Sequence, residues 1–519
     1  MSGIYDIAVV GSGFAGSLMA MIAKRLGLSV ILLERGRHPR LMIGESSTPL
    51  SNLLLEELAA RYDLPAIQPL AKWGSWQQSY PQIACGLKRG FTFYHHELGK
   101  PDTPDPGRRN QLLVAASPHD GIADTHWYRA DFDAFFVDEA QRLGVEYVDE
   151  IKLTQYTALG NSVELAGQKD HSAMSVRAKF VIDATGPRGF LHRALQLSEA
   201  DLPDYPSTQA LYSHFSNVGW RPETTSEMPP YPIEDAAVHH IFDGGWIWML
   251  RFNNGITSAG VAATDRVTEK LRFADGAVAW KRLLQIIPSL EDQFANAKAE
   301  RPFTHVQRLS FLSNAIQGER WALLPSAAGF VDPLLSTGFP LTLLGISRLA
   351  NILERDWNSP RLDEQMKTYA AQTSLEIKAT ANLISALYAN MNRFPVFTAL
   401  SLLYFAAASF SETARRLKKP HLAPSFLLHD HPTFGPAYRD LLDRARHVRS
   451  MQDGDALMYD VLRTIEPLDV AGLCREDRRN WYPVDAEDLF RAASKVDATH
   501  DEIAQLLQSC GFYAGALAR

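Results

Sequence analysis

The N-terminal stretch of the chain carries a glycine pattern that constrains its fold more than any other feature. Gly11, Gly13 and Gly16 follow the apolar run 7–10 at the spacing G-x-G-x-x-G. The first glycine permits a tight turn, the second lets a pyrophosphate approach the backbone at a helix N-terminus, and the third lets that helix pack closely on the strand. A second apolar run ends at Glu34, whose carboxylate suits a ribose 2′-hydroxyl. Strand, helix, second strand and acid together predict a dinucleotide-binding α/β unit. The alternative, a glycine-rich turn that binds no ligand, would explain the glycines but not the second strand and its acid.

Composition and charge exclude several classes of protein. The chain has 519 residues, of which 46% are hydrophobic, so we expect a large core and more than one structural unit. The formal net charge is −7 and the basic residues are scattered, which argues against nucleic acid as a partner. Cys85, Cys474 and Cys510 are odd in number and widely spaced, which indicates a reducing compartment rather than a disulfide framework. Without a signal peptide or a zinc-like spacing, the sequence predicts a cytoplasmic protein with no metal site.

One apolar segment has two readings. Residues 394–410 are uncharged and near the lower length limit for a membrane span. The segment contains Pro395, Thr398, Ser401 and Ser409, and basic residues follow it. We interpret it as a buried or interfacial helix, with no membrane span, and keep a membrane span as the alternative.

Four later segments resemble a known family. The stretches GESSTP (44–49), YRADFDAFFVDEAQRLGVEY (128–147) and FVIDATGPRGFL (180–191) resemble FAD-dependent oxidoreductases of the aromatic-hydroxylase fold. The stretch DPLLSTGFPLTL (332–343) resembles the flavin-dependent halogenase branch of that fold. The resemblance covers roughly residues 1 to 350, on the family's usual element sizes.

The resemblance implies an α/β fold with three regions. The first is a Rossmann-type, glutathione-reductase-like FAD-binding domain that is discontinuous in sequence, from residues 1–75, 120–200 and 300–350. The second is a mixed β-sheet substrate domain, from residues 76–119 and 201–299. Beyond residue 350 the apolar spacing becomes helical, so we expect a helical C-terminal region over 351–519.

The resemblance also implies non-covalent FAD, used in its reduced form. Arg129 matches the family's arginine beside the cofactor, and its alternative role is a surface ion pair before a helix. Pro325 and Ser326 stand where the family has Gly-Asp, so a ribityl-binding acid is missing from the expected site. The expected cofactor-binding residues are Gly11, Gly13, Gly16, Glu34, Arg35, Gly44, Glu45, Ser46, Arg129, Asp183, Gly186, Asp332 and Gly338.

A helix expected to begin near residues 336–338 provides a candidate halide site. The resemblance implies that this helix N-terminus lies against the isoalloxazine ring and that the Ser-Thr-Gly segment binds the halide. Exposed N–H groups at a helix start can bind an anion without a basic side chain. Ser336, Thr337 and Gly338 fit that role, and a helix N-terminus there would steady an anionic reduced flavin.

Lys88 is the candidate catalytic residue, because it matches the position of the family's lysine before an aromatic strand. The resemblance implies that reduced flavin and O2 form a hydroperoxide, a halide attacks it, and hypohalous acid is released. A buried lysine with a lowered pKa could then deliver that oxidant to an aromatic substrate. The alternative is a solvated strand lysine next to Arg89. His96 would share the strand face of Lys88 if the strand continued.

The stretch GGWIWMLRFNNGITSAGV (244–261) predicts a β-hairpin, in which Trp246 and Trp248 share one face and Arg251 lies on the other. The family has a Trp-x-Trp-x-Ile-Pro run beside the flavin, where the indoles keep substrate from the hydroperoxide. Here leucine replaces isoleucine and Arg251 replaces proline. We therefore expect an indole wall in a divergent family member, with two ordinary core aromatics as the alternative.

Three activities remain open on these residues. The first is halogenation of an aromatic, and Leu335 at the position of the tryptophan halogenases' glutamate favours phenols, pyrroles or carrier-bound aromatics over free tryptophan. The second is an aromatic monooxygenase, with a peptide- or protein-bound residue as one possible substrate. Arg251 and the Pro325-Ser326 pair favour this second activity. The third is a geranylgeranyl-reductase-like FAD reductase. O2, chloride or bromide, and a separate flavin reductase are the expected co-reactants and partner, because no second G-x-G-x-x-G unit is visible.

Overall fold

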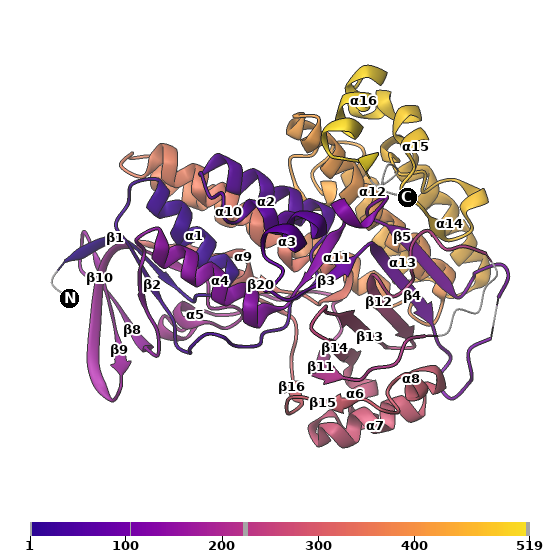
Figure 1. The fold of residues 1–519 in the computed structure, drawn as a ribbon, viewed down its shortest axis with the longest axis horizontal. Helices are drawn as coiled ribbons and strands as arrows, with labels where there is room; N and C mark the ends of the chain where they lie inside the picture. Colours follow the sequence, from indigo (N-terminus) through magenta and orange to yellow (C-terminus); the bar gives the residue numbers. More distant parts are fainter. Residues whose placement is uncertain (1–2, 104, 222–226, 515–519) are drawn as a thin grey trace.

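The computed structural model describes residues 3–103, 105–221 and 227–514, which fold around two β-sheets (Figure 1). The first sheet contains the glycine motif. Its central strand β1 (Ile4–Val10) lies between β10 (Ser172–Asp183) and β2 (Val30–Leu33), and both pairings are parallel. These strands form because continuous apolar runs suit a parallel sheet covered on both faces.

The remaining strands complete this first sheet on both sides of β1. They are β7 (Glu146–Val148), β8 (Lys152–Ala158), β9 (Val163–Lys169), β18 (Gln317–Gly318) and β19 (Trp321–Leu323). The strand order is β18-β19-β10-β1-β2-β7, and the β8-β9 hairpin extends β10. The helices that pack around it are α1 (Phe14–Arg25), α2 (Pro49–Arg61), α4 (Arg129–Arg142) and α10 (Gly338–Asp356).

The second sheet has nine strands and is mostly antiparallel. They are β4 (Gly90–His95), β5 (Gln111–Ala115), β11 (Thr208–Ser216), β12 (Ala237–Phe242), β13 (Gly245–Arg251), β14 (Ile256–Thr264), β15 (Lys298–Ala299), β16 (Thr304–Val306) and β21 (Trp481–Tyr482). The order is β15-β11-β14-β13-β12-β4-β5-β21, with β16 paired to β11. The predicted hairpin is confirmed as β13-β14, while β21 shows that the C-terminal region is not purely helical.

The two faces of β13 belong to different cores, as its alternation predicts. Trp246 and Trp248 lie in the main core, which also contains residues of α12 (Phe394–Arg416). Ile247 and Met249 lie in a second core against three helices. These helices are α6 (Asp265–Leu271), α7 (Ala277–Gln285) and α8 (Pro288–Gln293). The nine-stranded sheet is therefore covered on both faces, which leaves one face for each core.

The main core runs without interruption from the first sheet into the C-terminal helices. Those helices are α11 (Leu362–Tyr388), α13 (Phe434–Ala445), α14 (Met451–Ile465), α15 (Ala486–Arg491) and α16 (His500–Ser509). Because one core joins all three regions, the three-part domain division remains a proposal. By length and hydropathy α12 could cross a membrane, yet 83% of its apolar window is buried inside the structure, as expected for a core helix.

The lysine-bearing strand stands apart from both sheets. It is β3 (Cys85–Lys88), which pairs only with β6 (Asp124–Trp127) to form a two-stranded ribbon. The chain leaves this ribbon at Arg89 and enters the nine-stranded sheet at β4. The strand therefore does not continue, and His96 does not share a strand face with Lys88.

Candidate active site

The glycine turn forms a cradle at the carboxyl end of β1. Gly11 has a φ of +98°, and a Cβ there would lie 2.7 Å from the Ala184 carbonyl oxygen. A Cβ on Gly16 would lie 1.9 Å from the Gly11 oxygen. Only glycine fits these two places, which lets α1 begin directly above the strand with its first N–H groups facing the turn. Gly13 is the N-cap of α1, in extended conformation.

Glu34 lies beside this turn at the end of β2 and is buried. Its Oε2 accepts hydrogen bonds from Ser12 N at 2.9 Å and from Arg40 Nη2 at 3.1 Å. Although burial raises the pKa of Glu34, Arg40 and the backbone N–H groups of Ser12 and Gly36 bring it below its ordinary value. The carboxylate therefore stays ionised and suits a ribose hydroxyl. Arg35 is exposed, and Arg40 is a neighbour that the sequence reasoning missed.

Arg129 connects the glycine turn to the loop at residues 43–48. Its guanidinium forms two hydrogen bonds to the buried Asp133 carboxylate, both at 2.8 Å, and a third to the Gly44 carbonyl at 2.8 Å. Gly44 has a φ of +85°, and a Cβ there would lie 3.7 Å from Arg129 Nη1 and 3.9 Å from the ring of Phe339. The side chain is buried, so it does not form the surface ion pair of the alternative interpretation.

Two further residues predicted to bind the cofactor, Glu45 and Asp183, form hydrogen bonds within the protein. Glu45 is buried, and its Oε1 lies 2.8 Å from His214 Nε2 on β11, which links the 43–48 loop to the second sheet. Asp183 at the end of β10 accepts from Thr185 N at 2.8 Å and from Leu191 N at 2.6 Å. Asp183 therefore shapes the turn beside Gly11, where Gly186 has a φ of +80°.

Asp332 joins the two regions on which the candidate site depends. Its Oδ1 accepts from Trp246 Nε1 at 3.1 Å and from Leu334 N at 3.0 Å, and its Oδ2 accepts from Tyr388 OH at 2.9 Å. Burial raises the pKa of Asp332 to about 6, although the hydrogen bonds from Leu334, Tyr388 and Trp246 lower it. This carboxylate holds the indole of Trp246 against the turn before α10.

The turn that leads into α10 is strained and open. Leu335 and Ser336 have φ values of +63° and +54°, a region that costs such residues about 1–3 kcal/mol each. Thr337 is buried, and a Cβ on Gly338 would meet nothing within 4 Å. The start of α10 therefore has open space beside Gly338, and a helix N-terminus with such space suits an anion or a flavin edge. The three predicted halide residues lie together at this point.

Trp246 and Trp248 stand side by side on β13, with ring centroids 5.7 Å apart. Trp248 Nε1 donates to Ser258 Oγ at 3.3 Å within its own sheet, whereas Trp246 reaches across to Asp332. Arg251 faces the other way and forms an ion pair with the buried carboxylate of Glu234. The charge that replaces the family's proline is therefore turned away from the indole wall.

Lys88 is fully buried, which excludes the solvated alternative. Its Nζ donates to Ser46 Oγ at 3.0 Å and to the Ser47 carbonyl, and lies 3.8 Å from the ring centroid of Phe91. Burial lowers the pKa of the Lys88 ammonium, and the Asp124 carboxylate, its partner across the β3-β6 ribbon, opposes part of that shift. The lysine thus sits between the 43–48 loop and an aromatic ring.

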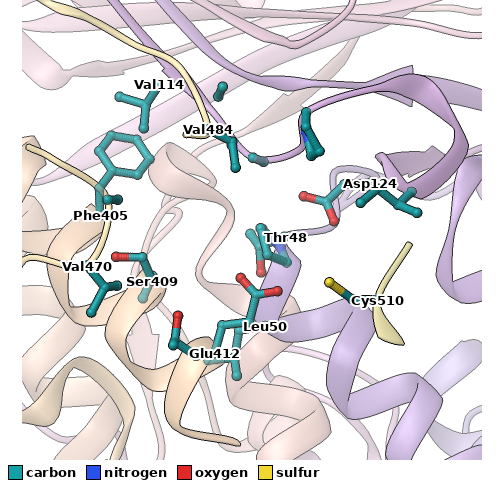
Figure 2. Close-up of a pocket in the computed structure, with 18 of the residues that line it drawn as sticks. Thr48, Leu50, Val114, Asp124, Phe405, Ser409, Glu412, Val470, Val484 and Cys510 are labelled. Atoms are coloured by element: carbon teal, nitrogen blue, oxygen red, sulfur yellow. The ribbon is translucent and has the colours of Figure 1, made fainter. Parts of the chain in front are cut away.

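Phe91 also lines a cavity of about 190 Å³, of which Figure 2 shows several other lining residues. Its apolar part is formed by Phe91 and Val114 of the second sheet and by Tyr404 and Phe405 of α12. Its polar part contains Thr48, Asn52, Asp124, Glu412 and Arg416. Asn52 and Asp124 were not predicted, because no local pattern marks them and only the packing of α2 against β6 brings them together.

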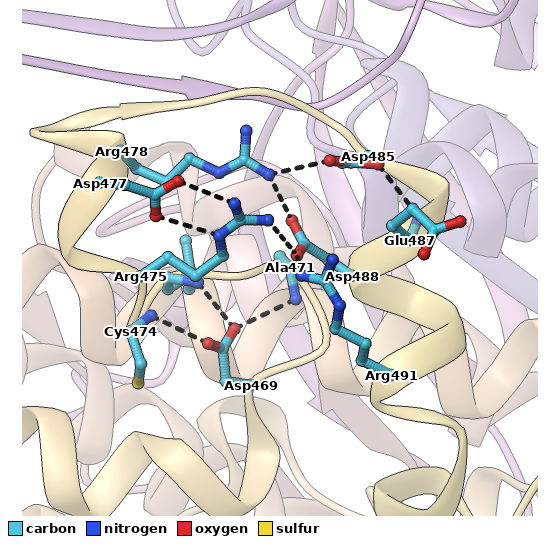
Figure 3. Close-up of polar contacts among 11 residues, drawn as sticks. Asp469, Ala471, Cys474, Arg475, Asp477, Arg478, Asp485, Glu487, Asp488 and Arg491 are labelled. Atoms are coloured by element: carbon cyan, nitrogen blue, oxygen red, sulfur yellow. Dashed lines mark hydrogen bonds and ion pairs between the residues drawn. The ribbon is translucent and has the colours of Figure 1, made fainter.

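The C-terminal segment 470–512 closes this cavity with residues such as Val470, Val484 and Cys510. A cluster of charged residues fixes the segment (Figure 3). The buried Asp488 carboxylate accepts hydrogen bonds from Arg475 at 3.1 Å and from Arg478 at 2.9 Å. Asp469 accepts from three backbone N–H groups, those of residues 471, 473 and 474. We call this segment, residues 470–512, the cap. Its hydrogen bonds and ion pairs hold it in a defined conformation.

The observed residues fit a bound dinucleotide flavin. Glycines that a Cβ would fill shape the cradle, a helix N-terminus faces it, and Glu34 stays ionised beside it. Arg129 supplies a buried positive charge at the next turn, and the start of α10 lies open beyond Gly44. The loop at 43–48 joins these parts, because Gly44 accepts a hydrogen bond from Arg129 and Ser46 accepts one from Lys88.

Comparison with known proteins gives a consistent result. A sequence model of the family described as tryptophan halogenase matches residues 123–395. The chain is 30% identical over 353 residues to the monodechloroaminopyrrolnitrin halogenase PrnC of Pseudomonas fluorescens, covering 67% of this chain and 61% of that protein. It is 29% identical over 365 residues to the tetracycline 7-halogenase of Kitasatospora aureofaciens, covering 67% of this chain and 62% of that one. It thus spans less than two thirds of either relative.

Among solved structures, a mutant of the halogenase PltM in complex with FAD superposes with a TM-score of 0.81. The identity is 25%, and the match covers 92% of this chain and 99% of that one. The likeness therefore includes most of the C-terminal helices and confirms the predicted fold class.

Proposed function

Because the chain belongs to the tryptophan halogenase family of flavin-dependent enzymes, we propose that it is an FAD-dependent oxidoreductase that halogenates a small aromatic molecule. One observation carries this proposal. Lys88 is fully buried, with its ammonium held between the loop at 43–48 and the ring of Phe91. That loop touches Arg129 on the cofactor side and Lys88 on the cavity side, so it separates the two halves of such a reaction.

FAD, bound without a covalent link, fits the cradle described above. When bound in fully reduced form, FAD would supply two electrons and two protons, with which O2, a halide ion and one further proton yield hypohalous acid and water. The chain contributes the rest by position. Gly11, Gly13 and Gly16 admit the pyrophosphate, and Arg129 adds a buried guanidinium. Thr337 and Gly338 offer N–H groups to the halide. The Ser336 N–H instead donates to the Pro333 carbonyl at 3.0 Å, so Ser336 would contribute through its hydroxyl.

Lys88 would hold the oxidant for the substrate. Burial lowers the pKa of Lys88, which makes its neutral amine more available for a hydrogen bond to hypohalous acid or for a bond to the halogen. Trp246 and Trp248 would keep the organic substrate away from the cofactor. The tie from Trp246 to Asp332 supports this role, because it keeps the indole fixed against the turn before α10.

The cavity supports a single-ring substrate. Its volume is about 190 Å³. An apolar cavity of roughly 150 Å³ accommodates benzene, so one substituted ring fits here. Leu335 in the turn before α10 also argues against free tryptophan, whatever the family is called. The cap at residues 470–512 favours a free small molecule over one carried on a protein, although a pyrrolyl-carrier-protein chlorinase is among the relatives.

Hydroxylation is the second candidate, and its main support has weakened. Arg251 and the Pro325-Ser326 pair were the features that favoured it, and the loss of the proline at position 251 would let substrate near the flavin. The Arg251 side chain instead pairs with Glu234 and donates to the Val218 and Gly219 carbonyls. These contacts fix the end of β13 on the face opposite the indoles, so they can restrict its motion as the family's proline would.

Two further inferences concern the cell. We expect a separate flavin reductase to supply reduced FAD, and O2 to be the oxidant. Cys85, Cys474 and Cys510 are all free, which supports a reducing compartment such as the cytoplasm.

The test combines purified protein, reduced FAD, O2 and a panel of phenols, anilines, pyrroles and indoles, with and without chloride or bromide. We expect halogenated products that require the halide and disappear in Lys88→Ala. Oxygenated products that form equally well without halide would support hydroxylation instead. Failure of the protein to take up FAD would defeat both.

A further inference from the structure

Two buried acceptor atoms in the cavity lack hydrogen-bond partners. They are Asn52 Oδ1 and Asp124 Oδ2, and no other described residue that lines the cavity has such an atom. Asn52 is 4% exposed and Asp124 is 5% exposed. A buried acceptor without a donor costs about 1–3 kcal/mol, so a pair of them at one end of a cavity indicates a ligand that brings donors.

The two side chains hold each other in place. Asn52 Nδ2 donates to Asp124 Oδ1 at 2.8 Å, which leaves one oxygen of each side chain unused. Asn52 comes from α2 and Asp124 from β6, so the two elements on either side of the cavity floor fix the site. Figure 2 shows that the Asp124 carboxylate points into the space between Thr48 and the cap.

The charges around Asp124 limit what can bind there. Lys88 faces it across the β3-β6 ribbon, and Glu412 approaches it from α12, where it pairs with Arg416 at 2.7 Å. Burial raises the pKa of Asp124 to about 7, although Lys88 lowers it. Each of the two carboxyl groups has its own cation, so an anionic ligand such as a carboxylate or a phosphate would meet two acidic groups whose cations are already engaged. A neutral donor, such as a hydroxyl or an aromatic amine, needs no cation.

We propose that Asp124 and Asn52 form an acceptor site that selects aromatic substrates bearing a hydroxyl or amino donor. The inference rests on the proposed function for the identity of the cavity as the substrate site. Asp124 is the cross-strand partner of Lys88, and Phe91, whose ring centroid lies 3.8 Å from Lys88 Nζ, lines the same cavity. A donor held by Asp124 therefore places its own ring in the part of the cavity that is closest to the lysine. A ring that donates a hydrogen bond to a carboxylate gains electron density at the positions ortho and para to the donor. Those are the positions at which we expect the carbon–halogen bond to form.

Equilibrium binding tests the proposal without turnover. Isothermal titration of the full chain would compare phenol with anisole, and aniline with N,N-dimethylaniline, because each pair differs in the donor. The titration is run at about pH 8, because burial raises the pKa of Asp124 to about 7 and the carboxylate is mostly ionised above that value. There we expect the wild-type protein to prefer the donor-bearing member by about 10-fold or more, as for hydrogen bonds to charged groups. In Asp124→Asn this preference should fall to within about 3-fold, with anisole binding unchanged. The two pairs also distinguish hydroxyl from amino selection.

Asp120→Asn is the matched control. Asp120 lies on the same stretch of chain, but its side chain is 58% exposed and pairs with Arg89 outside the cavity, so the donor preference should persist. Equal affinity of the wild-type protein for phenol and anisole would overturn the proposal, and this arm needs no variant. An unchanged preference in a folded Asp124→Asn protein would overturn it as well. Donor preference without halogenation would count against the proposed function alone.

Discussion

Trp246 Nε1 donates a hydrogen bond to Asp332 Oδ1 over 3.1 Å, and this contact joins the nine-stranded sheet to the turn before α10. Tyr388 of α11 donates to the other oxygen of the same carboxylate at 2.9 Å. A single buried acid thereby fixes the indole wall relative to the candidate halide site. The resemblance implied that both the indoles on β13 and the turn before α10 lie beside the flavin. Asp332 connects these two elements.

Removing that indole donor should destabilise the protein. In Trp246→Phe the buried Asp332 loses one of its donors, so we expect the free energy of unfolding to fall by about 1–3 kcal/mol in addition to the lost packing. Urea unfolding measures the change. Trp248→Phe is the control, because its Nε1 bonds only to Ser258 on the neighbouring strand. A drop as large in Trp248→Phe as in Trp246→Phe would contradict a special role for the contact with Asp332.

The raised pKa of Asp332 predicts a pH dependence of stability. Burial raises this pKa from an ordinary 3.8 to about 6. Between these values the folded state keeps a proton that the unfolded state has lost, so stability falls as pH rises from about 4 to about 6. A two-unit shift corresponds to about 3 kcal/mol. Unfolding curves across this range should be flatter for Asp332→Asn than for the wild-type protein, and parallel curves would rule out Asp332 as the source.

Replacing Lys88 should stop halogenation of the aromatic substrate without stopping the formation of hypohalous acid. In Lys88→Met the fold keeps a side chain of similar length, but no amine remains between Ser46 and Phe91. We expect product formation to fall at least about 100-fold, within the range for loss of an activated nucleophile or proton donor. Trapping of free hypohalous acid with a reactive 1,3-diketone should continue.

Lys179→Met is the control for this experiment, since Lys179 is half-exposed on β10 and pairs with Asp6. Its product yield should equal that of the wild-type protein. Full product yield from Lys88→Met would remove the lysine from the mechanism.

Arg251 should matter for stability and not for the kind of product. Its ion pair with Glu234 has side-chain exposures of 15% and 7%. Arg251→Met therefore removes the guanidinium partner of a mostly buried carboxylate, which keeps the hydrogen bond from the Arg221 N–H. After allowance for partial exposure, we expect a loss of about 2 kcal/mol in unfolding free energy. The double variant Arg251→Met/Glu234→Gln should recover part of it. A rise in oxygenated product in Arg251→Met would revive the hydroxylation hypothesis.

The cap over the cavity depends on Asp488. Asp488→Ala removes the common acceptor of Arg475 and Arg478. The cap at 470–512 should therefore open more often and be cleaved faster by limited proteolysis. We also expect weaker binding of small aromatics, since this segment lines the cavity. Asp477→Ala is the matched control, because its side chain is 65% exposed and binds Arg475 alone at the surface. Equal cleavage of both variants would contradict the role of Asp488.

Local patterns in the sequence predicted the parts of the site that depend on neighbours in the chain. The glycine spacing identified the turn at Gly11, and the two-residue alternation on β13 separated Trp246 and Trp248 from Ile247. The helix start near Ser336 was also correct within a few residues. These features follow from backbone geometry over a few residues, so their signal is complete within a short stretch.

Only the tertiary structure decided which side chains meet across the fold. Trp246 and Asp332 are 86 positions apart, and Asn52 and Asp124 are 72 apart. Both contacts arise where separate elements pack together. The cap at 470–512 also lines the cavity only because of such tertiary packing. The local sequence patterns therefore determined the cradle and the hairpin, while the resemblance to the family proposed Lys88 as the candidate lysine. The packing of the two sheets and α12 determined the cavity and its acceptors, because burial and hydrogen bonding between distant residues leave no periodic trace in a single chain.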